Sequence, residues 1–110
     1  MALNAEQYKA KSDQEIAKEL CGLLGYEILK DGMGYGYEVV KDQSMPSREY
    51  FNPINSGDDT LPLIIEHDVS VINDDAGNVG AVIGNGEQVW LPKEKYLRAA
   101  VTAILLKLNG

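Results

Sequence analysis

The apolar positions in the first third of the chain recur at the spacing of an α-helix. Ser12 precedes Glu15 by three residues, an arrangement in which each side chain can bind the other residue's backbone N–H at a helix start. Gly25 can adopt the left-handed conformation that ends a helix. The pattern predicts an amphipathic helix from Ser12 to Gly25. Its apolar side comprises Ile16, Leu20, Cys21, Leu23 and Leu24.

A second helix is predicted at the end of the chain. Pro92 suits the first turn of a helix, and Asn109-Gly110 suits its end. The apolar positions between them spread around more than one side, so we expect this long helix to form the centre of the core. These positions are Leu97, Ala100, Val101, Ile104, Leu105 and Leu108.

The middle of the chain alternates β-prone runs with turn residues. Residues 26–29 and 35–40 flank Asp31-Gly32 and predict one hairpin, and residues 69–72, 79–83 and 89–91 predict a second group of strands. We expect residues 41–57 to form an ordered loop, because they are rich in Ser, Pro, Asn and Gly. A short helix should follow, with Asp58 or Asp59 as its N-cap and Pro62 inside its first turn.

These elements predict one α+β domain spanning residues 1–110. An isolated hairpin is only marginally stable, so we expect the two hairpins to form one small antiparallel sheet of about four strands packed against the long C-terminal helix. The N-terminal helix and the short middle helix complete the fold. Residues 1–11 are expected to form a loosely ordered N-terminal extension.

Composition narrows the class of protein. The 110 residues carry a formal charge of −7, which disfavours direct binding to nucleic acid or to anionic membrane surfaces. The N-terminus lacks the apolar core of a signal peptide, and the longest apolar stretch is too short to span a bilayer. A single cysteine, Cys21, excludes an internal disulfide and suits a reducing cytoplasm.

The sequence offers no recognisable catalytic constellation. His67, the only histidine, lies between Glu66 and Asp68, but adjacency in sequence does not orient an acid–base pair. Cys21 belongs to an apolar pattern, and there is no G-x-S-x-G elbow. Residues 73–80 contain oxygen ligands at spacings that fit a hairpin turn better than a calcium loop. We predict a non-enzyme without a catalytic residue, metal or cofactor.

One charge pattern is unusual. Residues 49–92 contain eight acidic side chains and no Lys or Arg across 44 positions. The carboxylates can simply be solvated residues of helix starts and turns. They can also form a negative face that attracts a neutral or basic host protein. The candidate partner-binding residues are Asp58, Asp59, Asp74, Asp75 and Glu87.

Three short motifs resemble the small phage and prophage proteins of the NinX type, which are functionally uncharacterised. They are "YFNP" at residues 50–53, "PLIIE" at 62–66 and "LRAAV" at 97–101, and the likeness in element order covers roughly residues 12–108. The chain departs from the family pattern at 91–96, where "LPKEKY" replaces a shorter entry to the last helix. The resemblance implies a phage accessory role inside a bacterial cell and singles out Phe51, Asn52 and Arg98.

Three functions remain open at this point. The first is a cytoplasmic binding module that acts on a host protein through the acidic residues. The second is a small-ligand binder or minor enzyme with a pocket beside residues 44–59, contacted by Phe51, Asn52, His67 or Arg98. The third is a structural homo-oligomer, although the sequence does not define an oligomeric state. We also expect Arg98 to bind carbonyls of the Asn52-Pro53 loop.

Overall fold

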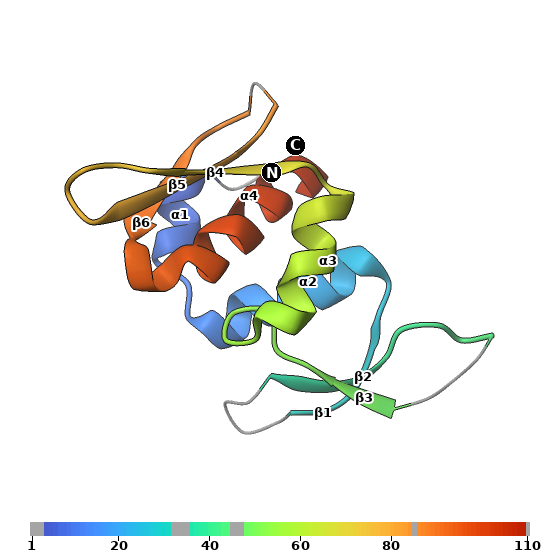
Figure 1. Ribbon diagram of the computed structural model, residues 1–110. Helices are drawn as coiled ribbons and strands as arrows, with labels where there is room; N and C mark the ends of the chain where they lie inside the picture. The colour runs from blue at the N-terminus through green and yellow to red at the C-terminus, as the bar shows by residue number, and fades with distance from the viewer. Residues whose placement is uncertain (1–3, 32–35, 45–47, 85, 110) are drawn as a thin grey trace.

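Two three-stranded antiparallel sheets lie at opposite ends of the molecule, with α2, α3 and α4 between them (Figure 1). A computed structural model describes residues 4–31, 36–44, 48–84 and 86–109. Sheet A has the strand order β1-β2-β3, and sheet B has the order β4-β5-β6. The elements in chain order are α1 (Ala5–Lys9), α2 (Asp13–Leu24), β1 (Glu27–Asp31), β2 (Tyr37–Val40), β3 (Arg48–Phe51), α3 (Gly57–Glu66), β4 (Val69–Asn73), β5 (Asn78–Ile83), β6 (Val89–Pro92), η1 (Lys93–Lys95) and α4 (Tyr96–Asn109).

The predicted α+β class is confirmed, but the strands form two sheets instead of one. Residues 48–51, expected within a loop, pair with β2 as strand β3 and place Phe51 opposite Tyr37. β6 pairs with β5, so each hairpin gains a third strand. The sheets stay separate because sheet B packs on α4, whereas sheet A closes a larger cluster around α2 and α4. The expected turn at Gly32 lies outside the described residues.

The predicted ends of α2 are confirmed. The Ser12 hydroxyl accepts the N–H of Glu15 at 3.1 Å, and the Glu15 carboxylate accepts the N–H of Ser12 at 3.2 Å. Gly25 ends the helix with φ of 77°. Local side-chain chemistry therefore determines both ends of this helix.

The start of α3 differs from the prediction. Its N-cap is Ser56, so the helix begins one residue before Asp58 and Pro62 lies beyond the first turn. Neither aspartate is the N-cap residue. The buried Thr60 hydroxyl instead donates to the carbonyl of Ser56 at 3.0 Å and to that of Pro53. These bonds hold the first turn of α3 against the preceding loop.

The last helix, α4, is the centre of the core, as predicted. Every residue from position 98 to position 105 is buried, and α4 contacts all three strands of sheet B and all three other α-helices. Its small residues Ala99 and Ala103 allow close approach of sheet B, and Ile104 and Leu105 fill the larger cluster toward sheet A. Leu108 remains partly exposed at the end of the helix.

The N-terminal segment, where we expected a loose extension, contains the short helix α1. Asn4 and Gln7 form a capping box at the start of α1, a signal present in the sequence but missed. Tyr8 is fully buried, and its hydroxyl donates to Glu19 at 3.0 Å and accepts from Asn109 at 2.6 Å. Residues 4–11 thus belong to the packed structure.

Burial should make the only thiol unreactive. Cys21 is fully buried, and desolvation raises its pKa to about 11. Because the thiolate is the reactive species, a thiol reagent at about pH 8 should leave the native protein unmodified and label it on unfolding. Mass spectrometry after timed labelling measures this. Rapid native labelling at the rate of a free thiol would contradict the placement of Cys21.

Candidate functional site

The five candidate acidic residues lie in three separate regions. Asp58 and Asp59 are in the first turn of α3, Asp74 and Asp75 lie in the β4–β5 turn, and Glu87 precedes β6. The α3 start, the β4–β5 turn and the β5–β6 connection point to different parts of the molecule (Figure 1). The acidic residues of the segment 49–92, which we call the acidic run, therefore follow one another in sequence but do not form one continuous face of the molecule.

Three of these carboxylates also accept backbone hydrogen bonds within the molecule. Asp59 accepts the N–H of Asn52 at 2.8 Å, and Glu87 accepts the N–H of Ala5 at 2.9 Å. Asp74 accepts the N–H groups of Asn78 and Ala76 at 2.8 and 2.9 Å. Such bonds explain the position of these acids without a partner protein.

The hydrogen bonds of Asp74 predict a pH dependence of stability. The backbone N–H of Asn78, with that of Ala76, lowers the pKa of Asp74. A lowered folded-state pKa adds stability above the ordinary aspartate range, and this stability is lost as the pH falls through the lowered pKa. We expect Asp74→Asn to make unfolding less pH-dependent below about pH 4, measured by urea unfolding across that range. An unchanged pH dependence would contradict this role.

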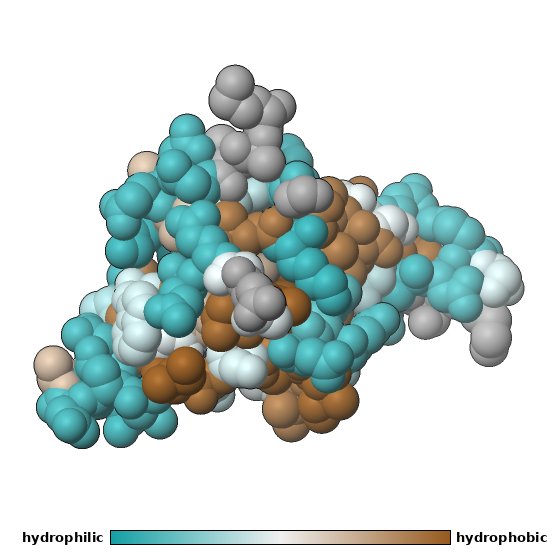
Figure 2. All heavy atoms as spheres, turned by 90° about the horizontal axis from the view of Figure 1, so that it is seen from above, coloured by the Kyte–Doolittle hydropathy of each residue, from teal (hydrophilic) through white to brown (hydrophobic). Residues whose placement is uncertain are grey.

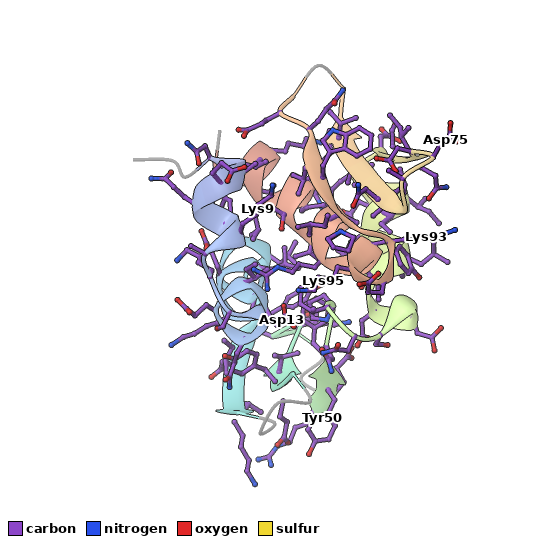
Figure 3. The ribbon with its side chains drawn as sticks, turned by 90° about the vertical axis from the view of Figure 1, so that its left-hand side faces the viewer. Lys9, Asp13, Tyr50, Asp75, Lys93 and Lys95 are labelled. Carbon is purple, nitrogen blue, oxygen red and sulfur yellow. The ribbon has the colours of Figure 1, made fainter. Side chains whose placement is uncertain are left out.

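Lys93 lies close to the same turn. Its backbone N–H donates to the carbonyl of Gly77 at 2.9 Å, and Figure 3 shows its side chain below Asp75. Lys93, the first basic residue after the segment 49–92, thus lies near the turn. Among the described residues, no ion pair joins Lys93 to Asp75.

Arg98 has a structural position different from the one we expected. It is 8% exposed and binds Asp13 together with the carbonyls of Tyr8 and Lys11, with the Tyr8 contact at 3.1 Å. The expected bonds to the Asn52-Pro53 loop do not form. The guanidinium instead bonds the α1–α2 connection to α4. The Asn52-Pro53 loop is therefore held by other residues.

The "YFNP" motif is held by α3 and by aromatic packing. Thr60 and Asp59 of α3 bind Pro53 and Asn52, as described above. Phe51 is buried and packs edge-on against Tyr26, with ring centroids 5.2 Å apart. Phe51 is therefore a core residue and is not available to a ligand.

His67 ends α3. Its backbone N–H donates to the carbonyl of Leu63 at 2.9 Å. Its Nε2 atom is buried and has no hydrogen-bond partner among the described residues. The side chain therefore does not cap helix carbonyls through Nε2.

A pocket does lie beside the 44–59 loop. Its volume is about 240 Å³, which is small for a metabolite site. Asn52 is the one residue among Phe51, Asn52, His67 and Arg98 that lines it. The lining exposes more apolar than polar surface, with polar side chains from the α2 start and the loop around it. It consists of Ser12, Asp13, Gln14, Ala17, Gly36, Tyr37, Asn52, Ile54 and Asn55.

The outer side of α3 exposes aliphatic side chains beside acidic ones. Leu61 and Ile65, one helical turn apart, are 56% and 68% exposed. Positions three or four apart share a side of a helix, so Asp58, Pro62 and Glu66 lie on the same side, and all are exposed. We call these five residues the α3 surface. Figure 2 shows that hydrophobic residues remain visible between hydrophilic ones on the upper face of the molecule.

No group of three or more His, Cys, Asp or Glu side chains among the described residues is arranged to hold a metal ion. None of the described helices combines the length and the apolar character needed to cross a bilayer. The α3 surface and the loop pocket are the two candidate sites described so far.

No protein-family model and no curated protein sequence matches the chain. The resemblance to NinX-type proteins therefore stays a prediction from the three motifs.

Proposed function

We propose that this protein is a non-catalytic module that binds another protein through the α3 surface. The observation that supports this most strongly is the exposure of Leu61 and Ile65 to water in the free protein. Burial of these apolar side chains in a complex would lower the free energy. Asp58 and Glu66 on the same side of the helix favour a partner with basic residues around an apolar centre.

In this proposal only some of the acidic residues between positions 49 and 92 contact the partner. Among them, Asp58 and Glu66 accompany the exposed aliphatic residues, whereas Asp59 and Glu87 have internal partners. The net charge of −7 attracts a basic protein from a distance, and the α3 surface supplies the contact. The net charge thus accounts for the long-range attraction, and the α3 surface accounts for the contact.

The motif resemblance supports a setting for this binding. We infer that the module is a phage or prophage accessory protein that acts on a host protein in the bacterial cytoplasm. The basis is the "YFNP" and "LRAAV" pattern at residues 50–53 and 97–101.

A tagged pull-down with elution in rising salt tests the proposal. We expect one stoichiometric partner, released at moderate salt because attraction between exposed charges is screened. The double variant Leu61→Ser/Ile65→Ser should lose that partner, and Asp58→Lys/Glu66→Lys should weaken its capture.

The matched control removes exposed apolar side chains elsewhere. Leu29 and Tyr50 of sheet A are 40% and 64% exposed, so Leu29→Ser/Tyr50→Ser removes a comparable apolar area away from α3. This control should keep the partner. Retention of the partner by Leu61→Ser/Ile65→Ser, or equal loss in both double variants, would contradict the proposal.

The loop pocket favours a second candidate function, binding of a small ligand. Arg98 is engaged by Asp13, and the Asp13 carboxylate lines the pocket, so an anion is disfavoured there. A small uncharged molecule that combines an apolar part with a few hydrogen-bonding groups fits this lining better. Ligand-observed NMR with sugars, amides and nucleosides should give signals that Asn55→Trp abolishes by filling the pocket; signals that survive this change would exclude the pocket.

A further inference from the structure

β4 is the least protected strand edge in the described parts of the two sheets. Edge strands usually carry charges, prolines or bulges that prevent further pairing. β1 has charged residues and a register shift after Ile28, β3 contains Arg48 and Glu49, and β6 ends in Pro92. β4 has the sequence VSVIN, pairs with β5 in continuous register and contains none of these features.

The free edge of β4 is accessible. Positions 70–73 are exposed, with Val71 at 42% and Ile72 at 45%. β4 has one strand neighbour, β5, and no backbone hydrogen bond outside the sheet involves residues 69–73 among those described. The outward N–H and C=O groups of this strand are therefore available to an added strand.

β4 follows α3 in the chain and contacts it. α3 leads directly into β4 (Figure 1). Val71 is opposite Ala81, whose side chain is buried against α4; because directly opposed residues share a face of the sheet, Val71 lies on the helix side of sheet B. α3 also packs against α4 on this side. A chain added to β4 would thus direct every second side chain toward the side where α3 lies.

We propose that β4 accepts an extended segment of the partner as a fourth strand of sheet B, and that this segment has apolar residues at its centre and Lys or Arg at both ends. This inference rests on the proposed protein-binding function. The charges flanking β4 support the basic ends, because Asp68 precedes the strand and Asp74 and Asp75 follow it. No described ion pair neutralises these three residues.

A second copy of the chain fits this edge less well. Antiparallel self-pairing centred on Val71 would place Asp68 of each copy next to Asp74 of the other. Like charges on directly opposed positions destabilise a strand pair. The same acids favour a basic segment, so charge complementarity distinguishes the two occupants.

A peptide probe tests the inference directly. The probe is a short synthetic peptide of alternating Val and Thr with Lys pairs at both ends, and the control peptide has Glu pairs instead. With the Lys peptide, amides of residues 69–73 that face outward should exchange with solvent about tenfold more slowly, measured by NMR hydrogen exchange. The Glu peptide should leave their exchange unchanged.

Variants of β4 provide a second test of the inference. Val71→Pro removes a backbone donor at the edge, and Val71→Lys keeps the backbone but adds the charge that natural edge strands use. Both should weaken binding of the Lys peptide by about tenfold or more. Unchanged binding by Val71→Lys, protection elsewhere than β4, or protection that rises with protein concentration without peptide would overturn the inference.

The two proposals fail in distinguishable ways. If Val71→Lys keeps the pulled-down partner while Leu61→Ser/Ile65→Ser loses it, the α3 surface binds the partner and strand addition is wrong. If Leu61→Ser/Ile65→Ser keeps the partner, the proposed function itself fails. Loss of the partner in both variants, with retention by Leu29→Ser/Tyr50→Ser, supports both.

Discussion

Replacing Arg98 with alanine is expected to lower the free energy of unfolding by about 2–4 kcal/mol. The change leaves Asp13 without its cation and leaves the buried carbonyl of Tyr8 without this donor. Asp13 is itself half-exposed, so water recovers part of the loss. Urea unfolding followed by circular dichroism measures the difference.

Two comparisons separate this effect from a general loss of positive charge. Arg98→Lys keeps the charge but cannot reproduce the planar fork of donors, so we expect a smaller loss of about 1–3 kcal/mol. Arg48→Ala removes an exposed arginine with a 3.6 Å contact to Glu38 and should cost less than about 1 kcal/mol. Equal losses for Arg98→Ala and Arg48→Ala would contradict the anchoring role of Arg98.

Replacing Gly36 with alanine is expected to destabilise the fold by about 3 kcal/mol or more. Gly36 has φ of 91°, a conformation that favours glycine. A Cβ atom at this position would also lie 2.3 Å from the carbonyl oxygen of Phe51 and 2.8 Å from Cα of Asn52. Because both contacts are with backbone, rotation of a side chain cannot relieve them.

Gly77 provides a matched control for backbone conformation. Its φ is 85°, but a Cβ atom there would meet no atom within 4 Å. Gly77→Ala should therefore cost only the conformational term, about 1 kcal/mol. Thermal unfolding of both variants compares them. Similar losses would mean that the close approach of Gly36 to the "YFNP" strand end does not constrain the fold.

Sequence reasoning succeeded where the determining interactions are local. Ser12, Glu15 and Gly25 specify the ends of α2 through contacts within a few residues, and these ends are as predicted. The third strand of sheet A was missed because Phe51 is its only buried residue, so it lacks a strong apolar pattern. Its pairing depends on β2, which no local signal in the strand reveals.

The candidate sites were harder to predict, since they depend on contacts between distant residues. Arg98 was recognised as special, but its partners at Tyr8 and Lys11 are 90 and 87 positions away. On α3 the sequence LPLII gives no indication of which side is buried. The polar Thr60 occupies an interior position while Leu61 and Ile65 are exposed, the reverse of their hydropathy.

Site-specific photo-crosslinking in cells that express the protein tests the central claim, that the α3 surface binds a protein partner. A photoreactive amino acid replaces Ile65 in one variant and Tyr50 in another; both native side chains are strongly exposed, and Figure 3 shows Tyr50 at the end of the molecule away from sheet B. We predict one dominant crosslinked protein from position 65 and none from position 50. No product from position 65, or the same products from both positions, would contradict the account.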